Sequence, residues 1–165
     1  MIGNRRQFIV GAALLLAGPA AMRLAGAAPA AAAGLDKSQL IYLTPLLADG
    51  SESKCHAEIW FVHYKEEIYV CTPANAWRTM AIKRGLKRAR IWVGEFGAWT
   101  DAKDAFRAAP TFIIEGQIEA TPAMQAEVLE VFGTKYAAEW GKWGPRFRDG
   151  LADGSRALLR YRVAA

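Results

Sequence analysis

Short segments rich in β-branched, aliphatic and aromatic residues recur along this chain between turn signals, a pattern typical of β-strands. The turn dipeptide Asp49-Gly50 closes the first of these segments. The predicted strands span residues 40–47, 57–63, 67–72, 90–94, 111–118 and 157–163. Six short strands in one small domain predict a mainly β fold with a few helices, either a sandwich or a barrel.

One predicted helix follows the fifth strand. Thr121-Pro122 is a start signal, with a capping residue and a proline at the first helical position. Gly133 is a stop signal. Apolar residues recur at helical spacing between the two signals, at Met124, Val128, Val131 and Phe132. We expect this helix to pack on the core and to carry no chemistry.

A second predicted helix spans residues 76–89. Its apolar stripe contains Ala81, Ile82, Gly85, Leu86 and Ala89, and its opposite, basic face contains Lys83, Arg84, Lys87 and Arg88. We expect the basic face to be solvated. Arg78 is the exception, because it lies within the apolar arc at the first turn, where the helix dipole disfavours a cation. Two roles remain open for it: to hold an anion with free backbone N–H groups, or to cover apolar surface with its stem.

Residues 139–146, Glu-Trp-Gly-Lys-Trp-Gly-Pro-Arg, are predicted to form a loop because glycine and proline disfavour regular structure. The two tryptophans in this segment suit a loop that covers a groove or contacts a partner subunit. The chain has six tryptophans in all. A tryptophan more often belongs to a core or an interface than to a cofactor site.

The amino terminus has the three parts of a cleavable export signal. Two arginines precede an apolar run over residues 9–22, and a small-residue stretch follows at 25–34. A membrane span needs about 20 strongly apolar residues. Pro19 and Arg23 also disfavour the alternative, an uncleaved membrane anchor. We therefore expect no stable span after cleavage.

Arg5, Arg6, Phe8 and Ile9 resemble the twin-arginine pattern, Arg-Arg-x-Phe followed by an aliphatic residue. The resemblance implies export of a folded domain by the twin-arginine machinery, to the periplasm or outside a bacterial cell. It divides the chain into a signal peptide at residues 1–34 and one domain at residues 35–165.

The signal accounts for most of the net charge. The whole chain has 21 Lys and Arg against 16 Asp and Glu, a formal charge of +5. Three of the arginines and none of the acids lie in residues 1–34, which leaves 18 minus 16, or +2, for the domain. This charge gives no reason to expect a nucleic-acid ligand.

The cysteines and histidines are too far apart in the predicted hairpin for a disulfide or a shared metal. A turn at residues 64–67 pairs Cys71 with a residue near Trp60, which leaves Cys55 about five positions, or ~16 Å, further along. A disulfide tolerates about 7 Å between Cα atoms, so we expect two free thiols. His56 and His63 fall on opposite faces of one strand and cannot chelate one ion together.

Read in order, these segments resemble the pyridoxamine-phosphate-oxidase-like family of flavin-binding split β-barrels. The similarity covers about residues 38–163, and it depends on the order and spacing of several motifs. These are the Asp49-Gly50 turn, Ile59-Trp60-Phe61 in the second strand, Thr72 at the end of the third, Arg78 in the following helix, Gly116 after Ile114, and Lys135-Tyr136.

The resemblance implies a six-stranded split β-barrel that forms a homodimer, with FMN or a deazaflavin in each of two interface grooves. The positions that match the family's cofactor contacts are Ile59, Trp60, Phe61, Thr72, Asn75, Trp77, Arg78 and Thr79. Ala76 departs from the pattern, since a hydroxyl is expected there, and Asn75 or Thr79 could replace it. No catalytic side chain is assigned, because the flavin itself carries the hydride or electron.

Three functions remain open at this point. The first is an exported flavin-dependent oxidoreductase acting on a small organic substrate, which Arg78 and the export signal favour. The second is a haem-binding module on the same barrel, with His56 or His63 as an axial ligand. The third is a cofactor-free dimer used for protein interaction. Ala76 favours the second and the third.

Overall fold

The computed structural model describes residues 34–164. The predicted twin-arginine motif therefore lies outside the described residues. Within residues 34–164 no helix is long and apolar enough to cross a membrane.

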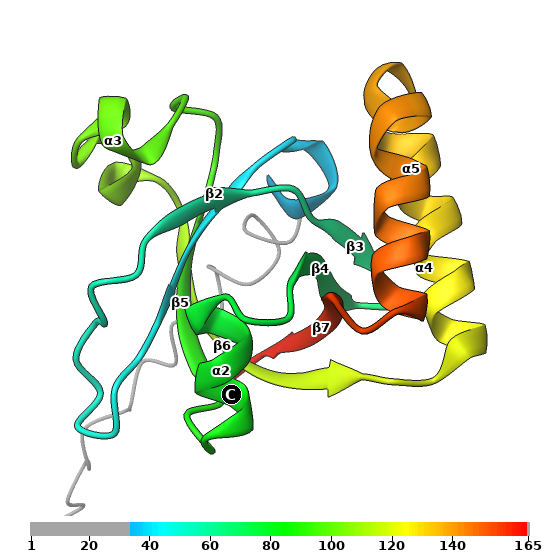
Figure 1. Ribbon diagram of the computed structural model, residues 1–165. Coiled ribbons are helices and arrows are strands. Elements are labelled where there is room, and N and C mark those ends of the chain that lie inside the picture. Colours follow the sequence, from blue (N-terminus) through cyan, green and yellow to red (C-terminus); the bar gives the residue numbers. More distant parts are fainter. Residues whose placement is uncertain (1–33, 165) are drawn as a thin grey trace, which may run out of the picture.

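The described chain is mainly β, with its helices grouped around a curled sheet (Figure 1). The strands are β1 (Ile41–Pro45), β2 (Ala57–Ile59), β3 (Val62–Tyr64), β4 (Glu67–Pro73), β5 (Arg88–Val93), β6 (Thr111–Glu119) and β7 (Arg156–Val163). The α-helices are α2 (Trp77–Lys83), α3 (Trp99–Ala102), α4 (Pro122–Lys135) and α5 (Ala137–Ala152), and a short 3-10 helix spans Ala105–Ala108. All strand pairs are antiparallel.

The expectation of six strands is wrong, because the predicted strand at 57–63 is two strands. The sheet order is β2-β1-β5-β6-β7-β4-β3. β2 pairs with β1 at one edge, with Tyr42 opposite Glu58, and β3 pairs with β4 at the other edge, with Val62 opposite Tyr69. Only residues 60 and 61 separate β2 from β3 along the chain. The sheet must therefore curl until its two edges meet, and the result is a half-barrel.

Tyr136, between α4 and α5, closes this gap between the edges. Its hydroxyl accepts a hydrogen bond from the Phe61 N–H at 3.0 Å. The same hydroxyl lies 2.8 Å from the carbonyl oxygens of Phe61 and Gln39, to which it can donate. The Trp60 ring stacks on the Tyr136 ring, with centroids 4.2 Å apart. The backbone of the connection is thus hydrogen-bonded although it belongs to neither strand.

Two apolar cores lie on opposite faces of β4. Ile68 and Val70 point into the barrel, whereas Tyr69 and Cys71 point outward beneath α4 and α5. The alternation follows from the two-residue period of a strand. Because both faces are covered, every residue from 68 to 72 is buried.

The expected second helix is too long, since α2 ends at Lys83 and β5 begins at Arg88. Gly85 adopts a left-handed backbone conformation with φ of 86°. The N–H of Leu86 donates to the Ala81 carbonyl, and the N–H of Gly85 donates to the Ile82 carbonyl. This is the Schellman stop signal, and glycine is the residue that suits it.

The predicted loop at 139–146 is also wrong, because these residues lie within α5. Figure 1 shows α4 and α5 side by side at one side of the sheet. Apolar residues recur along α5 at helical spacing, at Trp140, Trp143, Phe147 and Leu151. Their burial against α4 outweighs the local cost of the glycines and of Pro145.

Gly133 does not end its helix as predicted, since α4 continues to Lys135. The Trp140 indole packs directly on this glycine, and a Cβ at position 133 would lie 2.8 Å from Trp140 Nε1. Gly133 therefore allows α5 to pack closely on α4. A Cβ at Gly144, on the same helix as Trp140, would lie 2.9 Å from Cε2 of this indole, so Gly144 leaves room for the ring along α5.

Candidate functional site

A groove of about 450 Å³ opens where the end of β4 and the β2–β3 connection meet α5. We call it the arginine groove. Its lining is Leu40, Glu58, Ile59, Trp60, Cys71, Thr72, Pro73, Arg78, Trp143, Phe147 and Arg156. Four of the eight predicted cofactor residues are among them, Ile59, Trp60, Thr72 and Arg78.

Arg78 is held in the arginine groove by the preceding strand. Its Nε donates to Thr72 Oγ1 at 2.6 Å, and Thr72 is fully buried. Burial lowers the pKa of Arg78, although the nearby Cys55, Tyr161 and Glu58 oppose the shift. A guanidinium remains charged after such a shift. Arg78, the one cation in the apolar arc of its helix, is thus a charged side chain held in place by a hydrogen bond to Thr72.

Arg156 provides a second cation from a strand far away in the sequence. It is the first residue of β7 and pairs with Pro73 at the end of β4. Its guanidinium carbon lies 4.9 Å from the centroid of the Phe147 ring. Its methylenes rest on Gly150, where a Cβ would come within 2.8 Å of them.

Neither groove arginine has an acidic partner. The salt bridges among residues 34–164 include neither Arg78 nor Arg156. Glu58 is the one carboxylate in the lining, and its Oε2 accepts a hydrogen bond from the Trp99 N–H at 3.0 Å. Two cations without a carboxylate partner favour an anionic ligand in the groove.

Aromatic rings form the other wall of the arginine groove. The rings of Trp60 and Trp143 meet edge to face, with centroids 6.1 Å apart, and Trp143 contacts Phe147 at 6.2 Å. Beside them lies the Cys71 thiol, whose pKa is raised to about 12 by burial. This thiol is protonated at ordinary pH and behaves as a small apolar group.

The remaining predicted residues lie outside the groove lining. Phe61 is fully buried in the barrel, and the Lys135 ammonium sits 3.6 Å above its ring centroid. Asn75 is exposed and Trp77 is half-buried. Thr79 is buried, and its hydroxyl donates to the Pro73 carbonyl oxygen at 3.1 Å. Thr79, one of the two residues that could replace the hydroxyl missing at Ala76, therefore uses its hydroxyl to bind the end of β4.

Three lining residues, Trp143, Phe147 and Arg156, were not among the predicted cofactor contacts. Trp143 was placed in a groove-covering loop, and its two tryptophans were the available signal. Arg156 had no local signal, because it enters the site only through the pairing of β7 with β4.

The histidines lie outside the arginine groove. His56 Nδ1 is 2.6 Å from Thr44 Oγ1, and His63 Nδ1 is 2.7 Å from Asp36 Oδ1. Across residues 34–164, no group of three or more His, Cys, Asp or Glu side chains is arranged to hold a metal ion. The structure has Cys55 and Cys71 as free thiols.

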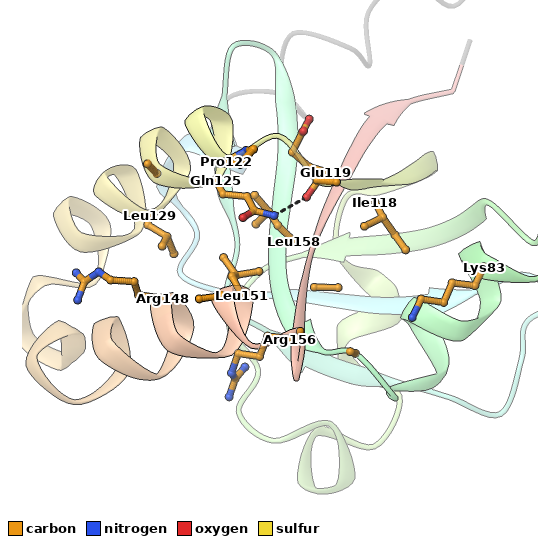
Figure 2. Close-up of a pocket in the computed structure, with 16 residues that line it drawn as sticks. Lys83, Ile118, Glu119, Pro122, Gln125, Leu129, Arg148, Leu151, Arg156 and Leu158 are labelled. Carbon is orange, nitrogen blue, oxygen red and sulfur yellow. Dashed lines mark hydrogen bonds between the residues drawn. The ribbon is translucent and has the colours of Figure 1, made fainter.

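A larger hollow, of about 620 Å³, lies between the sheet and the α4–α5 pair (Figure 2). It has the greater volume, but no aromatic residue lines it, and Arg78 and Thr72 are elsewhere. A planar cofactor needs flat apolar surface together with a few placed polar groups. The arginine groove is therefore the better candidate for a cofactor site.

No protein-family model matches the sequence, and no curated protein matches it. Solved structures do resemble it. The heme storage protein HutZ from Vibrio cholerae superposes with a TM-score of 0.57 at 17% identity, over 84% of this chain and 91% of that one. ChuZ from Campylobacter jejuni superposes with a TM-score of 0.58 at 12% identity, over 84% of this chain and 53% of that one.

A candidate pyridoxamine 5'-phosphate oxidase from Listeria innocua gives a TM-score of 0.53 at 13% identity, over 83% of this chain and 93% of that one. At these identities the comparison establishes the fold and not the activity. In its fold, this chain resembles the split barrels of these proteins: it is mainly β with helices, and residues 34–164 form a curled sheet of seven strands.

Proposed function

We propose that this chain is a flavoprotein that binds FMN in the arginine groove and acts as an oxidoreductase on a small organic substrate. The observation that carries the proposal is Arg78, which is hydrogen-bonded to Thr72 and shares the groove with Arg156; neither arginine forms a salt bridge within residues 34–164. Arg78 and Arg156 would hold the phosphate, and the buried Thr72 would position Arg78. Ile59 and Trp60 would contact the ring system.

The residues present fit such a cofactor in three respects. The groove volume of about 450 Å³ lies within the range of small-molecule sites. Its two guanidinium groups suit a phosphate, which arginine binds through paired hydrogen bonds. Trp60 and Trp143 offer ring surface to a planar group. When bound, a flavin supplies hydride or electron transfer, so the protein has only to bind the flavin, orient the substrate and shield both from water. A deazaflavin phosphate would satisfy the same contacts.

The proposal includes a homodimer and export. The groove opens to solvent on one side, as expected of a site that a second subunit completes. The resemblance to interface-binding flavoproteins supports the same arrangement. The Arg5-Arg6 motif supports folding and cofactor loading before export to the periplasm or beyond.

The test compares FMN with riboflavin, which lacks the phosphate. The purified protein should take up FMN, seen as flavin absorption bands that remain after gel filtration. Arg78→Ala should weaken FMN binding by about 10- to 100-fold, since a charge-assisted hydrogen bond is worth roughly 1.5–3 kcal/mol. Riboflavin binding should change little. Arg84→Ala is the control, because it removes the same charge from the opposite end of α2, where Arg84 packs on the Trp77 ring outside the groove lining.

A colourless protein that takes up neither FMN nor a deazaflavin would overturn the proposal. Equal losses of FMN and riboflavin in Arg78→Ala would show that the phosphate is held elsewhere.

Haem binding is the second candidate, and the similarity to the heme storage protein favours it. Neither histidine lines the arginine groove, so neither offers an axial ligand there. A Soret band after haem titration would replace the flavin proposal, and its loss in His56→Ala or His63→Ala would identify the axial ligand. Uptake of no cofactor at all would leave a dimeric interaction protein as the third.

A further inference from the structure

We propose that the 620 Å³ hollow is a second ligand site, and that it takes a single-chain organic anion such as a medium- or long-chain carboxylate. We call it the alkyl hollow. Apart from Arg156, it shares no lining residue with the arginine groove. It is therefore a separate site, and its occupation does not depend on a flavin.

The floor of the alkyl hollow is aliphatic. Its apolar lining consists of Ala74, Ile118, Ala120, Pro122, Ala126, Leu129, Leu151, Ala152, Ala157 and Leu158. None of these residues is aromatic, in contrast to the wall of the arginine groove. A floor of alkyl groups without a ring suits a flexible hydrocarbon chain better than a planar heterocycle.

The polar groups inside the alkyl hollow are already occupied. The Gln125 amide donates from Nε2 to the Glu119 carbonyl oxygen at 2.9 Å, as the dashed line in Figure 2 shows. The Glu119 carboxylate accepts from the Thr121 N–H at 2.8 Å and pairs with Arg160 at 3.1 Å. These bonds lower the pKa of Glu119 although burial opposes the shift, so the carboxylate stays charged and neutralised. A ligand with many hydroxyl groups would find few free partners here.

The rim of the alkyl hollow is cationic. Lys83, Arg148 and Arg156 line it, and none of them forms a salt bridge within residues 34–164. Figure 2 shows Arg148, from α5, and Lys83, from α2, at opposite ends, with Leu151, Leu158 and Ile118 between them. Charge and apolar surface thus both select an amphipathic anion.

The test is a titration of the full chain with octanoate, decanoate and dodecanoate below their micelle concentrations, followed by calorimetry. Each added methylene that reaches the floor should tighten binding about two- to fourfold. Inorganic phosphate should not compete at equal concentration, because it gains nothing from the floor. Absence of binding, or an affinity independent of chain length, would overturn the proposal.

Charge-matched double variants separate the rim from the overall charge of the protein. Lys83→Glu with Arg148→Glu should weaken dodecanoate binding by tenfold or more. Lys87→Glu with Arg146→Glu changes the net charge by the same amount at exposed positions outside the lining. This control should change the affinity for dodecanoate less than twofold. Equal losses in the two variants would reduce the effect to general electrostatics and overturn the site.

The two proposals fail independently. Arg78→Ala lies in the arginine groove alone and should leave dodecanoate binding intact whether or not the protein binds FMN. Ala126→Trp fills the alkyl hollow and tests whether the hollow is an interface between copies of the chain. If this variant shifted the protein from dimer to monomer, and the parent bound no carboxylate, the hollow would be such an interface and the ligand proposal would be wrong.

Discussion

The hydroxyl of Tyr136 is the feature of this fold whose removal has the most direct consequence. It lies at the junction of α4 and α5 and satisfies the backbone of Phe61, where the two edges of the sheet meet. Burial raises the pKa of Tyr136, so the group is a neutral donor and acceptor throughout the working pH range. Tyr136→Phe keeps the ring, and with it the stacking on Trp60, while deleting the hydroxyl.

The expected cost follows from the groups that lose their partner. The N–H and carbonyl of Phe61 belong to a residue with no exposed surface, and water cannot replace the hydroxyl there. An orphaned buried polar group costs about 1–3 kcal/mol, and a carbonyl left with one partner fewer costs less than an N–H. Tyr136→Phe also avoids the cost of burying a hydroxyl, which partly offsets this loss. Together these effects lower the free energy of unfolding by about 2–3 kcal/mol, or the Tm by roughly 6–15 °C for a domain of this size.

Urea unfolding followed by tryptophan fluorescence measures this loss, and the slope of the transition should not change. Tyr64→Phe is the matched control, because its hydroxyl donates to Glu127 at 3.2 Å on the surface. That variant should lie within about 0.5 kcal/mol of the parent. If Tyr136→Phe were equally neutral, the barrel would not be held closed by this hydroxyl.

Further outcomes follow from packing and from burial. Gly133→Ala should cost about 1–3 kcal/mol because an indole packs on this glycine, whereas Gly141→Ala, with nothing within 4 Å, should gain up to about 1 kcal/mol in thermal melts; equal effects would contradict the helix contact. Burial lowers the pKa of Lys135 from 10.5 to about 8, so the unfolded chain binds more protons than the folded one between these values. Stability relative to Lys135→Met should therefore rise across that window, by about 1 kcal/mol after allowance for partial exposure, and a difference constant with pH in urea titrations would refute it. Burial raises the pKa of Cys71 to about 12, so a thiol reagent should label the native protein once per chain, and not at all in Cys55→Ser; two labels would contradict the buried thiol.

The local sequence pattern predicted the strands well where a whole segment pairs with the same neighbouring strands. Five predicted strands are present near their expected positions, because β-branched and aromatic residues cluster wherever both faces of a strand are covered. The segment 57–63 was misread because its composition is uniform while its pairing is not: β2 pairs at one edge and β3 at the other. Composition cannot show which neighbour a strand chooses.

The candidate site divides in the same way. Arg78 could be recognised from its own helix, since a cation in an apolar arc is a local conflict. Arg156 could not, because only the pairing of β7 with β4 brings it to the groove. The tryptophans of α5 were found but misplaced in a loop, since glycine and proline signals hid a helical repeat that burial against α4 stabilises.

Closure of the barrel and assembly of the groove depend on the same few residues. Trp60 leaves the edge strand β2, stacks on Tyr136 and then lines the arginine groove, while Tyr136 holds the next residue of the chain by its backbone. Trp143 reaches the groove from α5, whose packing on α4 also positions Tyr136. The aromatic wall therefore exists only when α4 and α5 are packed together and the two sheet edges have met. A variant that weakens the contacts of Tyr136 should lose ligand affinity in the groove at temperatures below its global Tm, because the aromatic wall and the contact between the sheet edges open together. Arg78, braced by Thr72 on the other side, should keep its position in such a variant. In the proposed flavin complex, the contacts with the phosphate would then outlast those with the ring.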